Sequence, residues 1–557
     1  MVNGRYDEFT INRQIREMVT IREEDEERRV AELKILYGVD MLPPSITRLQ
    51  RLVTLDLRGS DITSIPPFIG RLRNLRELIC TKNMLNPPNE IGDLVRLKKF
   101  DMSDSKITSL PASIGRMQNL EELNLSNTRK LSNLPESIGD LIRLKNLKLK
   151  GSGIVSLPSS IGKLDELEKM DFSWAKNLSE LPSTIGDLQN LIALNLNWSG
   201  IASLPPSIGK LKNLKELNLS TTQALSQLPE EIGGLISLIK LNLRASGIQF
   251  LPSSICQLVN LSELDLSQTH KLSSLPEEIG DIANLNILKL QLSEIASLPN
   301  SIGRLKALKS LDLSETQHLS SLPEEIGDLS SLEKLNLQDS GIASIPRSIG
   351  RLQNLCNLDL SHMRKLVDLP LEIGNLSNLK ILAINNSGQS ILSLPKFVTR
   401  MEGLMQLDLF DYQEVNRQGQ NQWEMLLVLT QHCKLLGSLG WGFDSPRIAN
   451  RIYKNQLQPY AKKLSYALAC NRARSRIGFG FTNQTSGQKS TQILAPSLWP
   501  LLLGSSTRAF DWYSFEGKSH TVSPFHISEP DAIYQLLLDC RESFVGIFML
   551  SNQMKNT

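Results

Sequence analysis

A leucine pattern that returns sixteen times constrains the fold of this 557-residue chain more than any other feature. The pattern is LxxLxL or a close variant, and its first residue, the frame leucine, occurs sixteen times between Leu52 and Leu404. From Leu97 to Leu379 the step between frame leucines alternates strictly between 23 and 24 residues, so the true period is a pair of units, 47 residues long. Periods of this size are typical of solenoids, in which each unit buries its apolar side against its neighbours.

The apolar residues within one unit predict a short strand followed by a short helical turn. In the unit that begins at Leu191, Leu194 and Leu196 are two residues apart, as they would be on one side of a strand. The segment 204–211 then reads LPPSIGKL, in which proline suits the first turn of a helix and glycine permits close approach of a neighbour. Repetition of this unit predicts an α/β solenoid.

Hydroxyl residues form a column eight residues after the frame leucine. We expect this column to be structural, because such side chains bond locally to the backbone of a turn. The hydroxyls are Ser60, Ser105, Ser152, Ser199, Ser246, Ser293, Ser340 and Ser387, with Thr128, Thr222, Thr269 and Thr316.

The segment LPxxIGxLxxLxxLxL, as it begins at Leu157-Pro158-Ser159-Ser160-Ile161-Gly162, carries a family resemblance. The array resembles the plant intracellular Ras-group-related leucine-rich repeat proteins and the similar animal Ras-pathway scaffold. The resemblance implies a curved, horseshoe-shaped leucine-rich repeat solenoid that binds other proteins, with a parallel sheet on its concave side and short helical turns outside. It also implies small GTPases, kinases or phosphatases as candidate partners.

The periodicity divides the chain into four segments. Residues 1–40 have apolar residues at helical spacing around a charged run, and we expect a helical N-terminal cap or, alternatively, a short partner helix. Residues 41–411 are the repeat array, and residues 412–444 look like a degenerate terminal unit that acts as a C-terminal cap. Residues 445–557 form an extension of unknown function and mixed α+β character.

The extension begins with a basic segment, 445–476, that we expect to be helical. Residues 412–476 contain 10 Lys and Arg against 3 Asp and Glu. The segment either faces an anionic partner or is a solvated helix face. Residues 477–494 are rich in Gly, Ser, Thr, Gln and Asn, which is typical of a loop or linker.

The sequence offers little for catalysis. It contains no GxxxxGK[ST] phosphate-binding loop, no HExxH, no GxSxG and no kinase signature. We expect no catalytic residue, no cofactor and no metal site. The alternative is an enzymatic activity in residues 445–557, with His520, His526 and Cys540 as its candidate residues and the repeats selecting the substrate.

The face of the predicted sheet is polar at its centre. Positions are counted from the frame leucine, and positions two, four and six of each unit should point away from the core. Position four is Asp or Asn in twelve units, which is either a binding surface tilted toward acidity or ordinary repeat filler. The candidate binding residues from this column are Asp171, Asn195, Asp265, Asp312 and Asp359.

Two tryptophans depart from the repeat pattern. Trp174 and Trp198 both occupy position seven of neighbouring units, so we expect them to lie side by side at one strand end. They are either an exposed aromatic pair at an interface or packing against the adjacent turn. Nearby positions add the candidate residues Lys148, Lys150, Asn197 and Arg244.

Composition sets the remaining expectations. The 61 Lys and Arg against 58 Asp and Glu give a net charge of +3, which provides no general attraction to nucleic acid, and no nucleic-acid partner is expected. The six scattered cysteines form no CxxC pair, and no secretory signal or membrane-spanning stretch of about 18 apolar residues is visible. Together with the family resemblance, these features lead us to expect a non-enzymatic scaffold or adaptor in cytoplasmic signalling that binds a partner protein on its concave face.

Overall fold

The computed structural model describes residues 19–24, 29–35, 39–367, 369–384, 397, 400–401, 403–409, 438–443, 464–471 and 476–483. The chain divides into two compact units. The first comprises Met1–Asn357 with Asp368–Leu376, and the second Leu358–Val367 with Ser377–Thr557. No helix in these described residues is long and apolar enough to cross a membrane.

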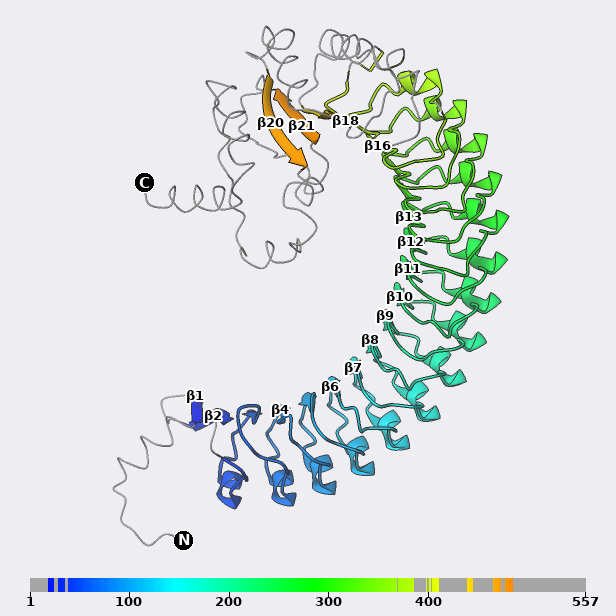
Figure 1. Cartoon of the computed structure of the whole chain (residues 1–557). Coiled ribbons are helices and arrows are strands. Elements are labelled where there is room, and N and C mark those ends of the chain that lie inside the picture. The colour runs from blue at the N-terminus through cyan, green and yellow to red at the C-terminus, as the bar shows by residue number, and fades with distance from the viewer. Residues whose placement is uncertain are drawn as a thin grey trace, which may run out of the picture. The chain divides into compact units, whose positions relative to one another are not determined.

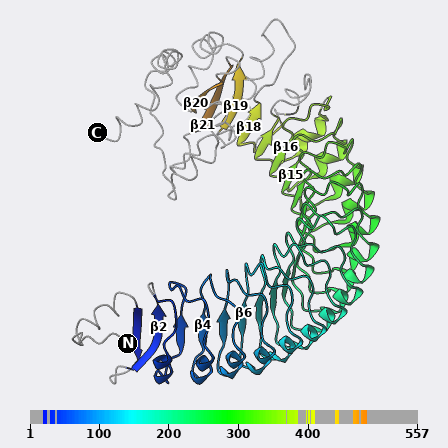
Figure 2. The same ribbon diagram turned by 60° about the horizontal axis from the view of Figure 1, so that its bottom comes forward.

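In the first unit, each repeat contributes a short parallel strand at the position predicted for it. Each strand pairs in register with that of the next repeat, as Leu194 with Leu217 and Leu217 with Leu241. Figures 1 and 2 show these strands side by side along the inner side of the curved first unit. The strands of the repeats are β3 (Thr54–Asp56), β4 (Glu77–Ile79), β5 (Lys99–Asp101), β6 (Glu122–Asn124), β7 (Asn146–Lys148), β8 (Lys169–Asp171), β9 (Ala193–Asn195), β10 (Glu216–Asn218), β11 (Lys240–Asn242), β12 (Glu263–Asp265), β13 (Ile287–Lys289), β14 (Ser310–Asp312), β15 (Lys334–Asn336) and β16 (Asn357–Asp359).

The helical turns are 3₁₀-helices of five residues, and those of the first unit lie along its outer side (Figure 1). A proline in extended conformation immediately precedes each one, as Pro205 precedes η8, and its carbonyl accepts a 2.9 Å hydrogen bond from the Ile208 N–H. The helices are η1 (Pro44–Arg48), η2 (Pro67–Arg71), η3 (Asn89–Asp93), η4 (Ala112–Arg116), η5 (Glu136–Asp140), η6 (Ser159–Lys163), η7 (Ser183–Asp187), η8 (Pro206–Lys210), η9 (Glu230–Gly234), η10 (Ser253–Gln257), η11 (Glu277–Asp281), η12 (Asn300–Arg304), η13 (Glu324–Asp328), η14 (Arg347–Arg351) and η15 (Leu371–Asn375).

Aliphatic side chains between these two layers form one continuous core. The apolar residues of the unit that begins at Leu191 are all buried, namely Leu191, Leu194, Leu196, Ile201, Leu204, Ile208 and Leu211. Because each unit buries these residues against its neighbours, the repeat explains both the core and the solenoid. The predicted α/β solenoid with a parallel sheet is therefore confirmed.

The prediction of a helical N-terminal cap is wrong for the residues described there. Strands β1 (Val19–Glu24) and β2 (Arg29–Ile35) form an antiparallel pair, and β2 pairs in parallel with β3 through Leu33 and Leu55. Apolar Ala31, Leu33 and Ile35 alternate with charged residues, which is the period of a strand. Pairing also satisfies the backbone groups that the first repeat strand would otherwise leave at a sheet edge.

The second unit contains both parallel and antiparallel strand pairs. Strand β17 (Ile381–Ala383) pairs in parallel with β18 (Gln406–Leu409), which pairs in parallel with β19 (Ser438–Phe443). Strand β21 (Arg476–Asn483) then pairs antiparallel with both β19 and β20 (Leu464–Asn471). Strand β19 lies within the predicted terminal unit at 412–444, whose role as a cap stays a prediction.

Two predictions for the extension are therefore wrong where residues are described. The segment 445–476 was expected to be helical, but Leu464–Asn471 and Arg476 are strand residues. The loop expected at 477–494 begins instead as strand β21, because Ile477, Phe479 and Phe481 alternate with glycine and threonine at the strand period. The remaining residues of the extension, including His520, His526 and Cys540, lie outside the described residues.

The hydroxyl column divides into two kinds, which corrects the expectation that all its members bond the turn. In the 24-residue units, threonine hydroxyls donate to the carbonyl three residues earlier, as Thr222 Oγ1 to Leu219 O at 2.6 Å. In the 23-residue units that begin between Leu97 and Leu332, serine hydroxyls such as that of Ser199 are buried without a protein hydrogen-bond partner. The Ser60 hydroxyl of the first unit instead donates to Leu57 O at 2.8 Å. The longer units have one more residue directly after this position, so the two kinds of turn differ in local geometry.

Candidate functional site

The Asp and Asn column at position four forms the turn that follows each strand. In eleven units the Oδ1 atom accepts a hydrogen bond of 2.8–3.2 Å from the backbone N–H two residues later. Asp and Asn are suited to this local bond because their short side chains place the Oδ1 atom, two bonds beyond Cβ, within reach of the backbone two residues later. These contacts give the column a structural role and support the interpretation of the column as repeat filler. A binding role for its members stays a proposal.

Position seven then adopts a left-handed backbone conformation. Its φ lies between 50° and 65° in twelve units, of which Gly151 is the glycine and Trp174 and Trp198 are the largest residues. The N–H of this residue donates to the next unit, as Trp174 to Asn197 O at 2.7 Å and Trp198 to Ser220 O at 2.9 Å. These bonds hold the residues from Asp104 to Glu315 in one column that runs along the strand ends.

Within this column the two tryptophan rings stack. Their centroids are 4.7 Å apart and their planes differ by 4°, which confirms that the side chains lie side by side. Trp174 is 43% exposed and Trp198 is 41% exposed, so neither ring is closed over by the adjacent turn. The Nζ atom of Lys176 lies 5.9 Å from the Trp174 ring centre, within reach of a cation–π interaction.

The structure brings most of the predicted candidates together around this pair. Strand register joins Lys148 to Asp171 and Asp171 to Asn195 on adjacent strands β7, β8 and β9. The Asn197 Oδ1 atom accepts a 2.9 Å bond from Ser220 Oγ. The candidates that lie farther away are Arg244 just after β11, Asp265 in β12, Asp312 in β14 and Asp359 in β16.

The two lysines at position four have carboxylate partners. Lys148 Nζ lies 2.5 Å from Glu122 Oε1, and Lys289 Nζ lies 2.6 Å from Glu263 Oε1. The hydrogen bond with Glu263 raises the pKa of Lys289 above its ordinary value. The positive charge of Lys148 is therefore paired with a carboxylate of its own sheet. Lys150, at position six, is exposed.

Sequence reasoning missed a cluster of one glutamate and two histidines in the turns that follow later strands. His318 Nε2 lies 2.8 Å from Glu294 Oε2, and His270 Nδ1 lies 4.0 Å from Glu294 Oε1. Glu294 occupies position nine, which is glycine in four other 23-residue units, including Gly200 and Gly247. That exception in the repeat was the signal available in the sequence.

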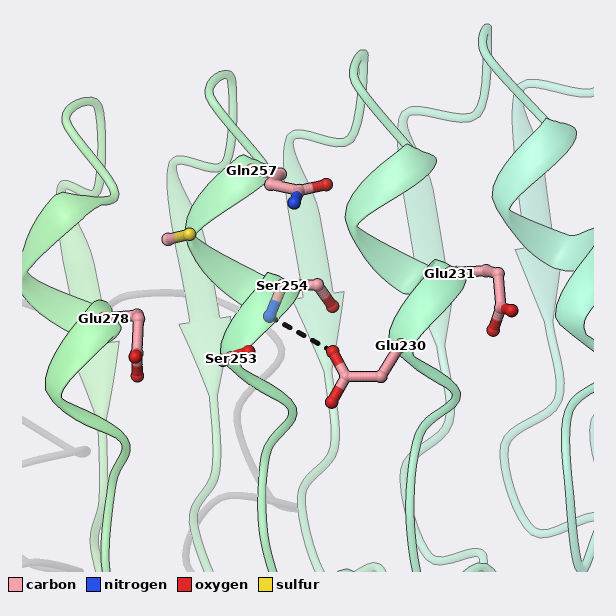
Figure 3. Close-up of a pocket in the computed structure, with 7 residues that line it drawn as sticks. Glu230, Glu231, Ser253, Ser254, Gln257 and Glu278 are labelled. Carbon is pink, nitrogen blue, oxygen red and sulfur yellow. Dashed lines mark hydrogen bonds between the residues drawn. The ribbon is translucent and has the colours of Figure 1, made fainter.

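A depression of about 400 Å³ opens on the outer side at η9, η10 and η11 (Figure 3). Cys256 stands here at the place of a glycine, and at equivalent glycines such as Gly233 an added Cβ would meet a neighbouring carbonyl at 2.1–2.7 Å. Glu230 Oε2 accepts a 3.4 Å bond from the Ser254 N–H, so this carboxylate serves the turn of the next unit. The depression contains no arrangement of groups that identifies a ligand.

Chemistry-bearing clusters are equally scarce among the residues that the structure describes. No group of three or more His, Cys, Asp or Glu side chains in this part of the chain is arranged to hold a metal ion. Cys80 is 3% exposed, and burial raises the pKa of its thiol, which keeps it protonated and unreactive. The stacked tryptophans are therefore the candidate site that the geometry favours.

Comparisons with known proteins agree on the fold. The family model "leucine-rich repeat region" matches residues 80–176, 136–226, 207–290, 263–340 and 301–439, which together exceed half of the chain. A solved leucine-rich repeat protein of Leptospira interrogans is 32% identical, with a TM-score of 0.57 over 67% of this chain and 93% of that one.

A plant peptide hormone receptor, RGFR1 in complex with RGF2, is 24% identical, with a TM-score of 0.46 over 71% of each chain. An internalin of Listeria monocytogenes is 19% identical, with a TM-score of 0.43 over 59% of this chain and 87% of that one. No curated protein is significantly similar to the chain.

Proposed function

Because this chain belongs to the leucine-rich repeat family, we propose that it is a non-enzymatic scaffold that binds a partner protein around Trp174 and Trp198. Leucine-rich repeat proteins act in protein–protein interaction. The binding surface would comprise the tryptophan pair with Lys150, Asn197 and the outward residues of β7, β8 and β9.

One observation carries this proposal. Two large aromatic rings stack in the open, each on a residue whose left-handed backbone disfavours a bulky side chain. Tryptophan is among the residues enriched in interface hot spots, because it buries a large rigid area on binding. The same backbone conformation is adopted by small residues at Gly151 and Ala245, so the column itself does not require an aromatic side chain.

We place the protein in cytoplasmic signalling. The described cysteines Cys80, Cys256 and Cys356 are free thiols, which suits a reducing compartment. The resemblance of the repeat motif to the Ras-group-related leucine-rich repeat proteins supports small GTPases, kinases or phosphatases as partners to test.

The test compares the intact chain with a Trp174→Ala/Trp198→Ala variant in capture from native lysate, followed by titration of the purified partner. Loss of two hot-spot residues should weaken binding by about 30-fold or more, equivalent to roughly 2 kcal/mol. Phe250→Ala is the matched control, because Phe250 is an aromatic residue of similar exposure, 51%, outside the position-seven column. A partner that binds the double variant as well as the intact chain contradicts the proposal.

The alternative function is an enzymatic activity in residues 445–557. It depends on His520, His526 and Cys540, which lie outside the described residues.

A further inference from the structure

The charges beside the tryptophan pair are strongly one-sided. We define the rim as positions six to ten of the units, which follow the strand ends. In the units that begin between Leu97 and Leu238, the rim has one acidic residue, Asp104, against six basic ones. The basic residues, all exposed, are Lys106, Arg129, Lys130, Lys150, Lys176 and Arg244.

The next four units reverse this balance. Between the units that begin at Leu261 and Leu332, the rim has one lysine, Lys271, against Glu294, Glu315 and Asp339. The basic stretch is therefore a local feature of the tryptophan region and does not reflect the chain's small net charge of +3.

Five of the rim cations also differ from Lys148 and Lys289 of the strand face in having no acidic partner. Within the described part of the chain, no carboxylate forms an ion pair with Lys106, Arg129, Lys130, Lys150 or Lys176. Asp104, the one acidic residue in the basic stretch of the rim, accepts a 2.9 Å bond from Asn127 Nδ2. Clustered cations that repel one another without internal compensation favour an external anion.

The same stretch is hollowed. A depression of about 440 Å³ is lined by Asp104, Ser105, Lys106, Asn127, Arg129 and Lys130. It precedes Gly151, which has no side chain, and then Trp174 in the position-seven column. The rim thus presents a basic hollow and an aromatic surface in sequence.

We propose that this rim, from Asp104 to Trp198, binds an extended acidic segment of the partner protein. Carboxylates of the segment would occupy the hollow beside Lys106, Arg129 and Lys130, while an apolar or aromatic residue packs on the tryptophan pair. This inference rests on the proposed function and specifies the partner's chemistry.

The spacing of the two subsites sets the length of the segment. Neighbouring strands are separated by about 4.8 Å, so Asn127 and Trp174, two strands apart, are roughly 10 Å apart along the column. An extended peptide advances about 3.3 Å per residue. The acidic residues should therefore precede or follow the apolar residue by about three to five positions.

The experiment measures binding of a fluorescein-labelled peptide with a run of glutamates and one phenylalanine four positions away. Arg129→Glu/Lys130→Glu should weaken binding by about tenfold or more at low salt and reduce its salt dependence. The matched control, Lys163→Glu/Lys210→Glu, makes the same charge change on exposed residues of η6 and η8 and should bind as the intact chain does. Equal weakening by both variants, or no weakening by either, overturns the inference.

Two further arms separate the possible failures. A single-stranded oligouridine probe that binds more tightly than the peptide, and is lost in both the tryptophan and the Arg129→Glu/Lys130→Glu variants, identifies a nucleic-acid surface and overturns the inference. If the lysate partner is lost with Trp174→Ala/Trp198→Ala but retained with Arg129→Glu/Lys130→Glu, the proposed function stands and the acidic segment does not. If the partner is retained by both variants, both proposals fall.

Discussion

Eleven residues other than glycine hold a left-handed backbone conformation at position seven, and this conformation costs free energy. The cost is larger for β-branched Thr221, at φ 59°, than for most residue types. We expect Thr221→Gly to stabilise the protein by about 1 kcal/mol, because relief of this strain exceeds the added entropy of the unfolded chain. The midpoint of urea unfolding measures the change.

A control for Thr221→Gly lies in a neighbouring unit. Ala193→Gly in strand β9 places glycine in ordinary strand backbone and should destabilise by about 0.5–1 kcal/mol. A lower urea midpoint for Thr221→Gly would show that position seven carries no such strain.

Asp56, in the first repeat strand, is a carboxylate whose pKa is shifted by its surroundings. Burial raises its pKa, but hydrogen bonds from the side chain and backbone N–H of Arg58, with the charges of Arg58 and Lys34, outweigh burial and leave the pKa lowered. A lowered folded-state pKa stabilises the protein above the unfolded-state pKa, and this stabilisation is lost as the pH falls through the folded-state value. Asp56→Asn should therefore cost about 1–3 kcal/mol at pH 7 and progressively less below about pH 4.

The measurement is the free energy of urea unfolding of both proteins across this pH range. Asp312→Asn is the control, because Asn336 makes the same backbone hydrogen bond one unit later. The control should change the free energy of unfolding by less than about 0.5 kcal/mol. An Asp56→Asn effect that does not vary with pH would show that the carboxylate's charge is unimportant.

At the scale of the element, the alternation of 23 and 24 residues has a steric basis. A Cβ added at Gly200 would lie 2.2 Å from the carbonyl oxygen of Lys176, in the longer unit that precedes it. Gly153, Gly247 and Gly341 meet the preceding unit in the same way. In these four pairs the extra residue of the longer unit therefore rests against a glycine of the shorter unit, so the two form one structural pair.

We expect Gly200→Ala to destabilise the protein by about 1–3 kcal/mol through this contact. The unit that begins at Leu285 already accommodates the side chain of Glu294 at the same position. Glu294→Ala should therefore cost less than about 1 kcal/mol, because it removes only the exposed contacts of Glu294 with His318 and His270. Thermal unfolding of both variants gives the comparison. Equal destabilisation would argue against the steric account.

At the scale of the whole molecule, the pair of units should be the block that the array can lose. Deletion of residues 285–331 removes one pair and leaves a longer unit followed by a shorter one, so Gly341 would meet the preceding unit as before. Deletion of residues 285–307 instead places two longer units next to each other. We expect the 47-residue deletion to unfold cooperatively, because solenoid stability is a sum of neighbour contacts, and the 23-residue deletion to be much less stable.

Circular dichroism during urea unfolding distinguishes the two deletions. Removal of residues 285–331 should lower the urea midpoint modestly, and this deletion should unfold as cooperatively as the intact chain. If the 23-residue deletion is as stable as the 47-residue deletion, the single unit is the structural block and the pairing of units has no energetic weight.

The leucine period by itself determined the solenoid, its strands and turns, the buried residues and the adjacency of Trp174 and Trp198, because these depend on contacts that every unit repeats. Tertiary structure decided what differs between units: which hydroxyls bond, that Lys148 has an acidic partner while Lys150 lies exposed, and that Glu294 joins two histidines. Tertiary structure also decided that Arg29–Ile35 and Arg476–Asn483 form strands. Each segment pairs with the hydrogen-bonding groups of a neighbouring strand, and local spacing in the sequence does not reveal that pairing.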